Sequence, residues 1–368
     1  MEKLLPNPQL NKIVLYKPGK SIDEVQKELG LKNVIKLASN ENPFGTSPKV
    51  KESIIDFLNN IHRYPDPNCI NLRKKLSEKL KVHFNEIIIG NGSDEIIELI
   101  FKAYINKGDE ILSCFPTFSY YKIAAEQTFG TFREIPLNNY KFNLSGLANS
   151  INNKTKIIII CNPNNPTGTY VSKVELTSFL KSIPSNILVV LDEAYFEFFE
   201  KGKEVNGIVL IKEFKEKNII VLRTFSKIYG LASLRIGYGI SKREIIENLN
   251  KVRQPFNVNG IAQIAAIAAI EDENFIVETY ENNLKCKKIL YEFFDKLKIF
   301  YLPSQTNFIF FDPEIENELV FNELLKRGII IRSLKSFGYK TALRISIGSE
   351  KETNLFLENF EKVYYYLR

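Results

Sequence analysis

The chain contains 368 residues, of which 44% are hydrophobic, so it can bury a substantial core and we expect two domains. Its 50 basic and 43 acidic residues give a net charge of +7 that is spread along the whole sequence, whereas a nucleic-acid-binding protein concentrates its basic residues in one stripe. We therefore expect no nucleic acid partner and interpret the charge as solvated surface, with a small anionic substrate as the alternative.

Membrane insertion, secretion and metal binding also find little support. The longest apolar stretches, residues 157–161 and 261–270, are too short to span a bilayer as a helix. Residues 1–20 lack the basic and apolar blocks of a signal peptide. The four cysteines lie far apart, and two histidines are too few for a multi-histidine metal site or a histidine-based hydrolase triad. We expect a cytoplasmic protein with reduced cysteines, no metal and no membrane contact.

Short β-rich runs alternate with helical patterns through the middle of the chain, which predicts a largely parallel sheet covered by helices. These runs are residues 86–89, 110–113, 132–135, 156–161, 187–191, 218–222 and 237–240. From about residue 242 the pattern becomes helical, and strands return at residues 306–311, 328–332 and 342–347, which indicates a smaller α+β unit. We place a large domain at residues 35–245 and a small domain, formed from both chain ends, at residues 1–34 and 246–368.

Ligands of parallel sheets bind beyond the carboxyl ends of the strands, so the residues that follow each predicted strand are the first candidates for chemistry. The first such segment is the glycine turn at residues 90–92, followed by Ser93, Asp94 and a helical pattern. Free backbone N–H groups and the positive end of the helix dipole suit this turn to a phosphate. An ordinary turn, with Ser93 or Asp94 capping the helix, is the alternative.

Two further strand ends carry polar groups. After residues 156–161 comes Asn-Pro-Asn-Asn-Pro-Thr-Gly, in which the prolines can hold the Asn165 side-chain amide rigidly; an ordinary loop is the alternative. After residues 187–191 come Asp192 and, three residues later, the phenol of Tyr195. Helix capping by Asp192 is the alternative there.

The fourth segment concentrates hydroxyl and basic groups. Residues 223–227 read Arg-Thr-Phe-Ser-Lys, and the apolar, glycine-containing stretch that follows carries Arg235. A lone lysine is usually a solvated surface group. Burial in such surroundings lowers the pKa of a lysine, however, and Lys227 then becomes a candidate nucleophile.

Together these segments supply what pyridoxal 5'-phosphate (PLP) needs: a lysine for its aldehyde, a carboxylate for its pyridinium nitrogen, donors for its phenolic oxygen and a cup for its phosphate. Their order resembles that of the fold-type I PLP aminotransferases, and the resemblance covers nearly the whole chain. It implies an α/β fold with a large, mostly parallel seven-stranded sheet domain and a smaller α+β domain.

The resemblance implies a role around the cofactor ring for five residues. Lys227 would form the Schiff base, and Asp192 would hold the ring nitrogen protonated. Asn165 and Tyr195 would hold the phenolic oxygen, and Phe118 would stack on the ring, where many relatives have tyrosine.

The resemblance also implies a phosphate cup, made of Ser93, Asp94, Thr224, Ser226 and Arg235. In this cup the Asp94 side chain would orient the helix start, because two anions repel each other. A departure from the family pattern is Ser233 in place of the usual glycine, which affects only local backbone detail.

Within that family, three short segments resemble histidinol-phosphate aminotransferases: residues 16–20, 40–43 and 63–66. In that family the tyrosine that matches Tyr64 reaches the cofactor phosphate of the neighbouring subunit, so the resemblance implies a homodimer; a simple turn is the alternative. Arg344 and Arg332 match arginines that bind the carboxylate or phosphate of a substrate, and exposed arginines are the alternative. The substrate-binding candidates are Arg332, Arg344, Tyr16 and Asn42.

The implied reaction is transamination of L-histidinol phosphate with 2-oxoglutarate, giving imidazole-acetol phosphate and glutamate, a step of histidine biosynthesis. Lys227 would act as nucleophile and general base, with Asp192 and Tyr195 as its catalytic partners. Aromatic amino-acid aminotransferases and threonine-phosphate decarboxylases use similar motifs and are the alternatives. A PLP-binding protein without catalysis is a more remote one, because such regulators usually carry an added DNA-binding domain and no helix-turn-helix segment is evident.

Overall fold

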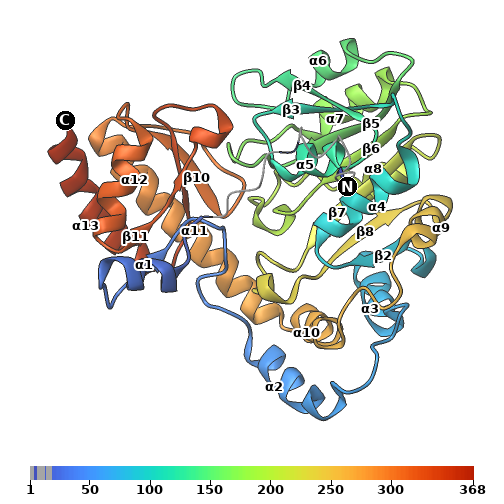
Figure 1. The fold of residues 1–368 in the computed structure, drawn as a ribbon, viewed down its shortest axis with the longest axis horizontal. Helices are drawn as coiled ribbons and strands as arrows, with labels where there is room; N and C mark the ends of the chain where they lie inside the picture. The colour runs from blue at the N-terminus through green and yellow to red at the C-terminus, as the bar shows by residue number, and fades with distance from the viewer. Residues whose placement is uncertain (1–3, 6–12, 14–18) are drawn as a thin grey trace.

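The computed structural model describes residues 4–5, 13 and 19–368, and its central feature is a seven-stranded sheet (Figure 1). The strand order is β2-β8-β7-β6-β5-β3-β4, and β8 runs antiparallel to both of its neighbours while the other pairings are parallel. The strands are β2 (Ile87–Gly90), β3 (Glu110–Phe115), β4 (Thr131–Pro136), β5 (Thr155–Cys161), β6 (Leu188–Asp192), β7 (Asn218–Thr224) and β8 (Gly237–Ser241). The predicted fold class, a mostly parallel seven-stranded sheet, is confirmed.

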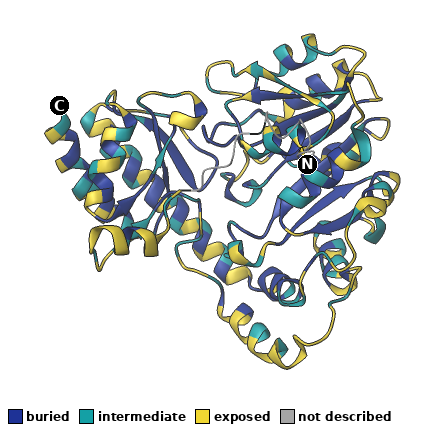
Figure 2. Ribbon diagram, viewed as in Figure 1, coloured by how far each residue is buried: buried dark blue, intermediate teal, exposed yellow. Residues whose placement is uncertain are grey.

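Helices cover both faces of this sheet, because its strands are apolar on both sides. Adjacent residues of β2 show the division. Ile88 packs into one hydrophobic cluster, with residues of the helices at 93–104, 120–126 and 173–182. Ile87 and Ile89 pack into another, with residues of the helices at 70–80 and 260–271. Ile157 to Ile160 are fully buried, and Figure 2 shows the inner strands of the sheet as buried, whereas the residues of edge strand β4 are exposed or half-buried. The helices that follow these strands are α4 (Ser93–Tyr104), α5 (Tyr120–Glu126), α6 (Leu144–Asn149), α7 (Lys173–Ser182), α8 (Gly207–Glu213) and α9 (Arg243–Val252).

A smaller antiparallel sheet, of order β12-β13-β10-β9, forms the second core of the molecule. Its strands are β9 (Phe300–Tyr301), β10 (Phe308–Asp312), β12 (Arg332–Ser333) and β13 (Leu343–Ser346). Stacked aromatic rings fill the space between this sheet and its helices; the ring centroids of Phe294 and Phe311, for example, lie 4.8 Å apart. The helices are α11 (Glu273–Leu297), α12 (Asn317–Lys326) and α13 (Glu350–Leu367).

The segment predicted as one strand at residues 328–332 is instead two short strands that belong to different sheets. Strand β11 (Ile329–Ile330) pairs in parallel with β1 (Ile35–Lys36), and β12 pairs with β13. The continuous apolar pattern hid this break, because both halves are buried or half-buried. The amino-terminal segment, which includes α1 (Ile22–Leu29), therefore lies beside the carboxyl-terminal elements (Figure 1).

Three further helices lie together near strands β2 and β8 of the large sheet (Figure 1): α2 (Pro48–Phe57), α3 (Ile70–Leu80) and α10 (Gly260–Glu271). Helix α11 begins next to α10 and runs from there to the smaller sheet (Figure 1). Within the part of the chain that the structure describes, no helix combines the length and apolarity needed to cross a membrane.

Gly230 is a position where the backbone requires glycine. Its φ is +69°, and a Cβ atom there would lie 1.9 Å from the Gly45 carbonyl oxygen. The Gly230 N–H donates to the Lys227 carbonyl oxygen at 3.0 Å, so Gly230 belongs to the loop that carries Lys227. Its close approach to Gly45 therefore packs this loop against residues 45–46. Any side chain must displace that backbone.

Replacing Gly230 with alanine should lower the free energy of unfolding by about 2 kcal/mol or more, because overpacking adds to backbone strain. Thermal unfolding measures this directly. Gly202→Ala is the matched control: Gly202 has a φ of +85° but no atom within 4 Å of the added Cβ. Equal losses in both variants would show that φ strain alone, and not the contact with Gly45, sets the cost.

Candidate active site

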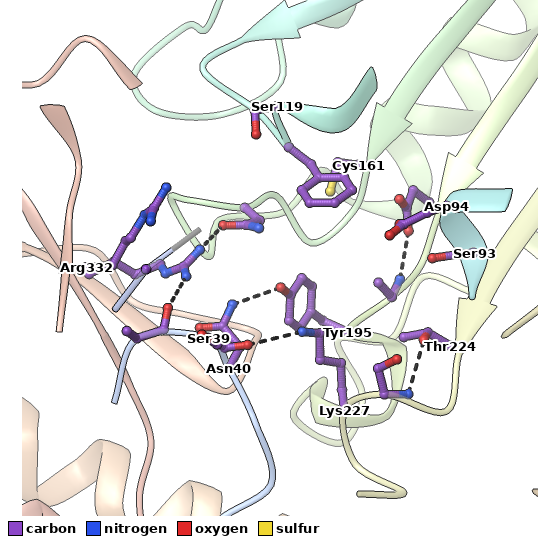
Figure 3. Close-up of a pocket in the computed structure, with 18 of the residues that line it drawn as sticks. Ser39, Asn40, Ser93, Asp94, Ser119, Cys161, Tyr195, Thr224, Lys227 and Arg332 are labelled. Atoms are coloured by element: carbon purple, nitrogen blue, oxygen red, sulfur yellow. Dashed lines mark hydrogen bonds between the residues drawn. The ribbon is translucent and has the colours of Figure 1, made fainter. Parts of the chain in front are cut away.

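A cavity lies where the carboxyl ends of the large-sheet strands face the smaller sheet (Figure 3). It is lined by most of the residues that the sequence singled out. These are Ser93, Asp94, Phe118, Asn165, Asp192, Tyr195, Thr224, Ser226, Lys227, Arg235, Arg332 and Arg344. Because β5, β6 and β7 are parallel neighbours, the loops that follow them open onto the same side of the sheet.

Lys227 lies in the loop after β7, and its amine points into the cavity. Its Nζ donates to the Ser39 carbonyl oxygen at 3.4 Å and lies 5.7 Å from the centroid of the Tyr195 ring. Burial, reinforced by the positive charge of Arg344, lowers the pKa of Lys227 to about 8. A large share of the amine is therefore unprotonated at mildly alkaline pH, as a nucleophile requires.

Asp192 ends β6 and is buried beneath the cavity. The Tyr121 hydroxyl donates to its Oδ2 at 2.6 Å, and the Ala194 N–H donates to its Oδ1 at 3.1 Å. Burial raises the pKa of Asp192 to about 6, and the hydrogen bond from Tyr121 opposes that rise. A buried carboxylate of this kind gains most from a cationic partner, such as a protonated ring nitrogen.

Hydrogen bonds connect the cavity residues of the large sheet to the smaller sheet and to the amino-terminal segment. The Tyr195 hydroxyl accepts from the Asn40 side-chain amide at 2.9 Å, and the Asn40 oxygen accepts from the Ser346 hydroxyl at 2.9 Å. The buried Arg344 guanidinium donates to the Asn165 side-chain oxygen and, at 2.7 Å, to the Ala38 carbonyl oxygen. Residues from β13 and from the amino-terminal segment thus fix the two side chains predicted to hold a phenolic oxygen.

The predicted phosphate cup gathers donors around the start of α4. Gly92, with a φ of +83°, is the N-cap and offers no side-chain bond, so neither Ser93 nor Asp94 acts as the helix cap. The Arg235 guanidinium donates to the Asp94 carboxylate at 3.1 Å and to the Ser226 hydroxyl at 3.5 Å. The Thr224 hydroxyl lies beside them and accepts from the Ser226 N–H at 3.1 Å.

The chemistry of these groups fits PLP. Hydroxyls, a guanidinium and a helix N-terminus suit a phosphate, the buried Asp192 suits a protonated ring nitrogen, and the amine with the lowered pKa suits an aldehyde. Phe118 lines the same cavity and packs edge-to-face on Tyr121, with centroids 5.4 Å apart. By contrast, residues 4–5, 13 and 19–368 contain no group of three His, Cys, Asp or Glu residues placed to hold a metal ion.

Two predicted residues in the described part of the chain do not line the cavity. Tyr64 is 84% exposed and stacks on Phe256, with centroids 4.7 Å apart. The Asn42 amide donates to the Ile228 carbonyl oxygen at 2.8 Å and to the Thr279 hydroxyl at 3.2 Å, so it supports the loop of Lys227 from behind. Tyr16 lies outside the described residues.

Sequence reasoning missed two residues that hold the site. Asn40 belongs to the Asn-Glu-Asn-Pro segment that we singled out, but we chose Asn42 from it as the candidate. Tyr121 lies three residues after Phe118, and no sequence pattern links its hydroxyl to an aspartate 71 residues away. The first could have been found from the motif; the second required the fold.

The family model described as "Aminotransferase class I and II" matches residues 32–360. The chain belongs to this aminotransferase family. It is similar to curated histidinol-phosphate aminotransferases from Caldicellulosiruptor saccharolyticus (48% identical, covering 95% of this chain and 97% of that one) and Moorella thermoacetica (45%, covering 95% and 90%).

Solved structures of the family share the fold. Histidinol-phosphate aminotransferase from Clostridium acetobutylicum superposes with a TM-score of 0.83 at 27% identity, covering 91% of this chain and 100% of that one. The enzyme of the same name from Sinorhizobium meliloti, in complex with pyridoxal-5'-phosphate, gives a TM-score of 0.89 at 24% identity and covers 98% of both chains.

Replacing Tyr121 with phenylalanine should raise the pKa of Asp192 by about one pH unit, because a hydrogen bond to the charged carboxylate is lost. Titration of the carboxyl group in cofactor-free protein, followed by NMR or infrared spectroscopy, measures this change. Tyr120→Phe is the matched control, since the Tyr120 hydroxyl binds Glu98 instead. An Asp192 pKa that is the same in Tyr121→Phe as in the unaltered protein would contradict the assignment.

Proposed function

We propose that this aminotransferase binds PLP and transfers the amino group of L-histidinol phosphate to 2-oxoglutarate, giving imidazole-acetol phosphate and glutamate for histidine biosynthesis. The observation that carries the proposal is the 48% identity, over 95% of the chain, to a curated histidinol-phosphate aminotransferase. The relatives described above share that name, which favours this reaction over an aromatic aminotransferase or a threonine-phosphate decarboxylase. A filled set of catalytic positions disfavours a silent PLP-binding protein.

In this proposal the cavity residues hold PLP by its separate groups. Lys227 would bond the aldehyde carbon, Asp192 would hold the ring nitrogen, and Asn165 and Tyr195 would hold the phenolic oxygen. Phe118 would cover the ring, and the phosphate would be held by Ser93, Asp94, Thr224, Ser226 and Arg235, all of which line the cavity. When bound, PLP supplies an electron sink for the charge left on the substrate carbon that loses a proton.

Lys227 is the base that moves this proton. The Lys227 Nζ, which its loop holds in the cavity, would accept the proton from the substrate carbon. Its pKa of about 8 lets it accept and release a proton near neutral pH. Tyr195 and residues 38–40 line the cavity around this amine.

Arg344 and Arg332 are proposed to bind the anionic ends of the substrates. They are direct register partners on the antiparallel strands β13 and β12, so both side chains extend from the same face of the smaller sheet. Like charges placed opposite each other repel, and a carboxylate or phosphate between them removes that repulsion. Guanidinium groups bind both anions bidentately, so one pocket can accept histidinol phosphate and glutamate in turn. Asn42 and Tyr16 remain predicted substrate contacts.

The active form is proposed to be a homodimer in which Tyr64 contacts the cofactor phosphate of the neighbouring subunit. Its exposed ring lies among other exposed apolar side chains that a partner chain would cover: Ile55, Leu58, Ile61 and Phe256. We also propose the domain division at residues 35–245 against 1–34 and 246–368, and a cytoplasmic location, which the four free cysteines support.

The substrate is tested by a half-reaction. Purified PLP form is mixed separately with L-histidinol phosphate, L-phenylalanine and threonine phosphate, and the visible absorbance of the bound cofactor is followed. We expect rapid conversion to pyridoxamine phosphate with histidinol phosphate. Faster conversion with phenylalanine would overturn the substrate, and carbon dioxide release from threonine phosphate would identify a decarboxylase.

Replacing Lys227 with alanine should lower steady turnover by at least about a thousandfold, because nucleophile and base are both lost. The matched control is Lys287→Met: Lys287 is also buried with a pKa lowered to about 8, but its amine donates to the Ser304 carbonyl oxygen and does not line the cavity. Normal turnover in Lys227→Ala would refute the assignment of Lys227.

The shared site is tested by mixing Lys227→Ala and Tyr64→Ala chains and letting the subunits exchange. If Tyr64 serves the partner's site, each mixed dimer contains one intact site, and the mixture should recover about a quarter of full activity, because half of the dimers are mixed. Activity no higher than the average of the two parent variants would contradict a site shared between subunits.

A further inference from the structure

A buried ion pair lies next to the cavity, between residues that adjoin two of its lining residues on neighbouring strands. Glu193 follows Asp192 at the end of β6, and Arg223 precedes Thr224 at the end of β7. Asp192 and Thr224 line the cavity, whereas side chains of adjacent strand residues point to opposite faces, so the pair lies behind the cavity wall. Both side chains are almost completely buried, with exposures of 2% for Glu193 and 3% for Arg223.

The pair is held by bonds on every side. Arg223 Nε and Nη2 both donate to Glu193 Oε2, at 3.0 and 2.8 Å, and the Phe196 ring covers the guanidinium at 3.6 Å. Glu193 Oε1 accepts from the Gly207 N–H at 2.5 Å, and Arg223 Nη2 also donates to the Asn206 oxygen at 3.0 Å. Since Asn206 is the N-cap of α8, one ion pair joins β6, β7 and the start of that helix.

The ion pair lies at the point where the backbone pairing of β6 with β7 ends. The last register pair of β6 and β7 is Asp192 with Leu222, and the Glu193 N–H donates to the Leu222 carbonyl oxygen at 2.9 Å. Arg223 and Thr224 continue beyond that point as partners of β8. The ion pair therefore adds a side-chain connection between the ends of β6 and β7, beside the backbone bond from the Glu193 N–H to the Leu222 carbonyl oxygen.

We propose that Glu193 and Arg223 are positioning residues that fix the distance between Asp192 and Thr224, and through them the seat of the cofactor. The inference rests on the proposed function, in which Asp192 takes the ring nitrogen and Thr224 the phosphate of the same molecule. The pyridine ring is rigid and the arm that carries its phosphate is short, so the two strand ends would have to stay within a narrow range of separations. A displacement of either end weakens binding and changes the environment of the ring nitrogen.

The test is the double variant Glu193→Met/Arg223→Met, which removes both charges together, so neither member of the pair stays buried without the other. The cofactor is removed from the purified chain, PLP is titrated back, and its absorbance gives the Kd and the pH dependence of the bound form. We expect the Kd to rise by about tenfold or more and the pH midpoint of the absorbance to shift. A wild-type Kd and midpoint would overturn the proposal.

The matched control is Glu110→Gln/Arg133→Met, which removes an ion pair between β3 and β4 at 2.7 Å, away from the cavity. The PLP affinity of this control should stay within about twofold of the unaltered protein, since a general loss of stability lowers the melting temperature without changing the seat of the cofactor. Equal weakening in both double variants would show that any lost ion pair suffices, and would refute positioning.

Circular dichroism shows whether the Glu193→Met/Arg223→Met variant folds. If it does not fold, the single variant Glu193→Gln tests the proposal in its place. Glutamine keeps an acceptor for the Gly207 N–H but loses the charge that holds Arg223, so a smaller rise in Kd and a shifted pH midpoint are expected. Unchanged values in a folded Glu193→Gln protein would contradict the proposal. Failure of the unaltered chain itself to bind PLP would instead refute the proposed function, so the two failures are distinct.

Discussion

Parallel pairing of β5, β6 and β7 is the constraint on which the cavity depends. Cys161 at the end of β5 is in register with Asp192 at the end of β6, and the loops after β5 and β7 carry Asn165 and Lys227. Antiparallel pairing would send alternate loops to opposite sides of the sheet. The apolar composition of these strands, which drives helices onto both faces, is therefore also what brings an amide, an acid and an amine together.

A second layer of polar contacts joins this edge to the smaller sheet. Arg344 bonds Asn165 and the Ala38 carbonyl oxygen, while Asn40 links Tyr195 to Ser346. These bonds are buried, so each lost partner would leave an unsatisfied polar group. The cavity is consequently a property of both sheets, and the smaller sheet contributes its anion-binding arginines from a position fixed by the larger one.

The sequence predicted the parts of the site that local patterns encode. Lys227, Asp192 and Asn165 stand directly after apolar runs, so the rule for parallel sheets located them, and the family resemblance gave them roles. Tyr121 and Asn40 escaped, because their partners are distant in the chain and a hydroxyl or amide looks the same in a loop as in a site. The break between β11 and β12 escaped for a related reason: periodicity reports burial but not which sheet a strand joins.

The same reasoning applies to Glu193 and Arg223. Both lie in segments that the sequence analysis singled out for other residues, Asp192 and Lys227. A charged residue next to a buried strand is nevertheless predicted to be exposed unless its partner is known. Only the register of β6 with β7 brings the two charges together. Long-range pairing, and not residue type, separates what sequence patterns could predict from what required the structure.

The pairing of β1 with β11 has a consequence for how the chain is made. The Asn40 N–H donates to the Ser346 hydroxyl across 306 residues, and Ile35 pairs with Ile329. A ribosome releases the amino-terminal strand first, so that strand waits without its partner until almost the entire polypeptide has emerged. The large sheet can assemble during synthesis, but the pairing of β1 with β11 is a late event, and chains that stop early expose an unpaired β edge to aggregation.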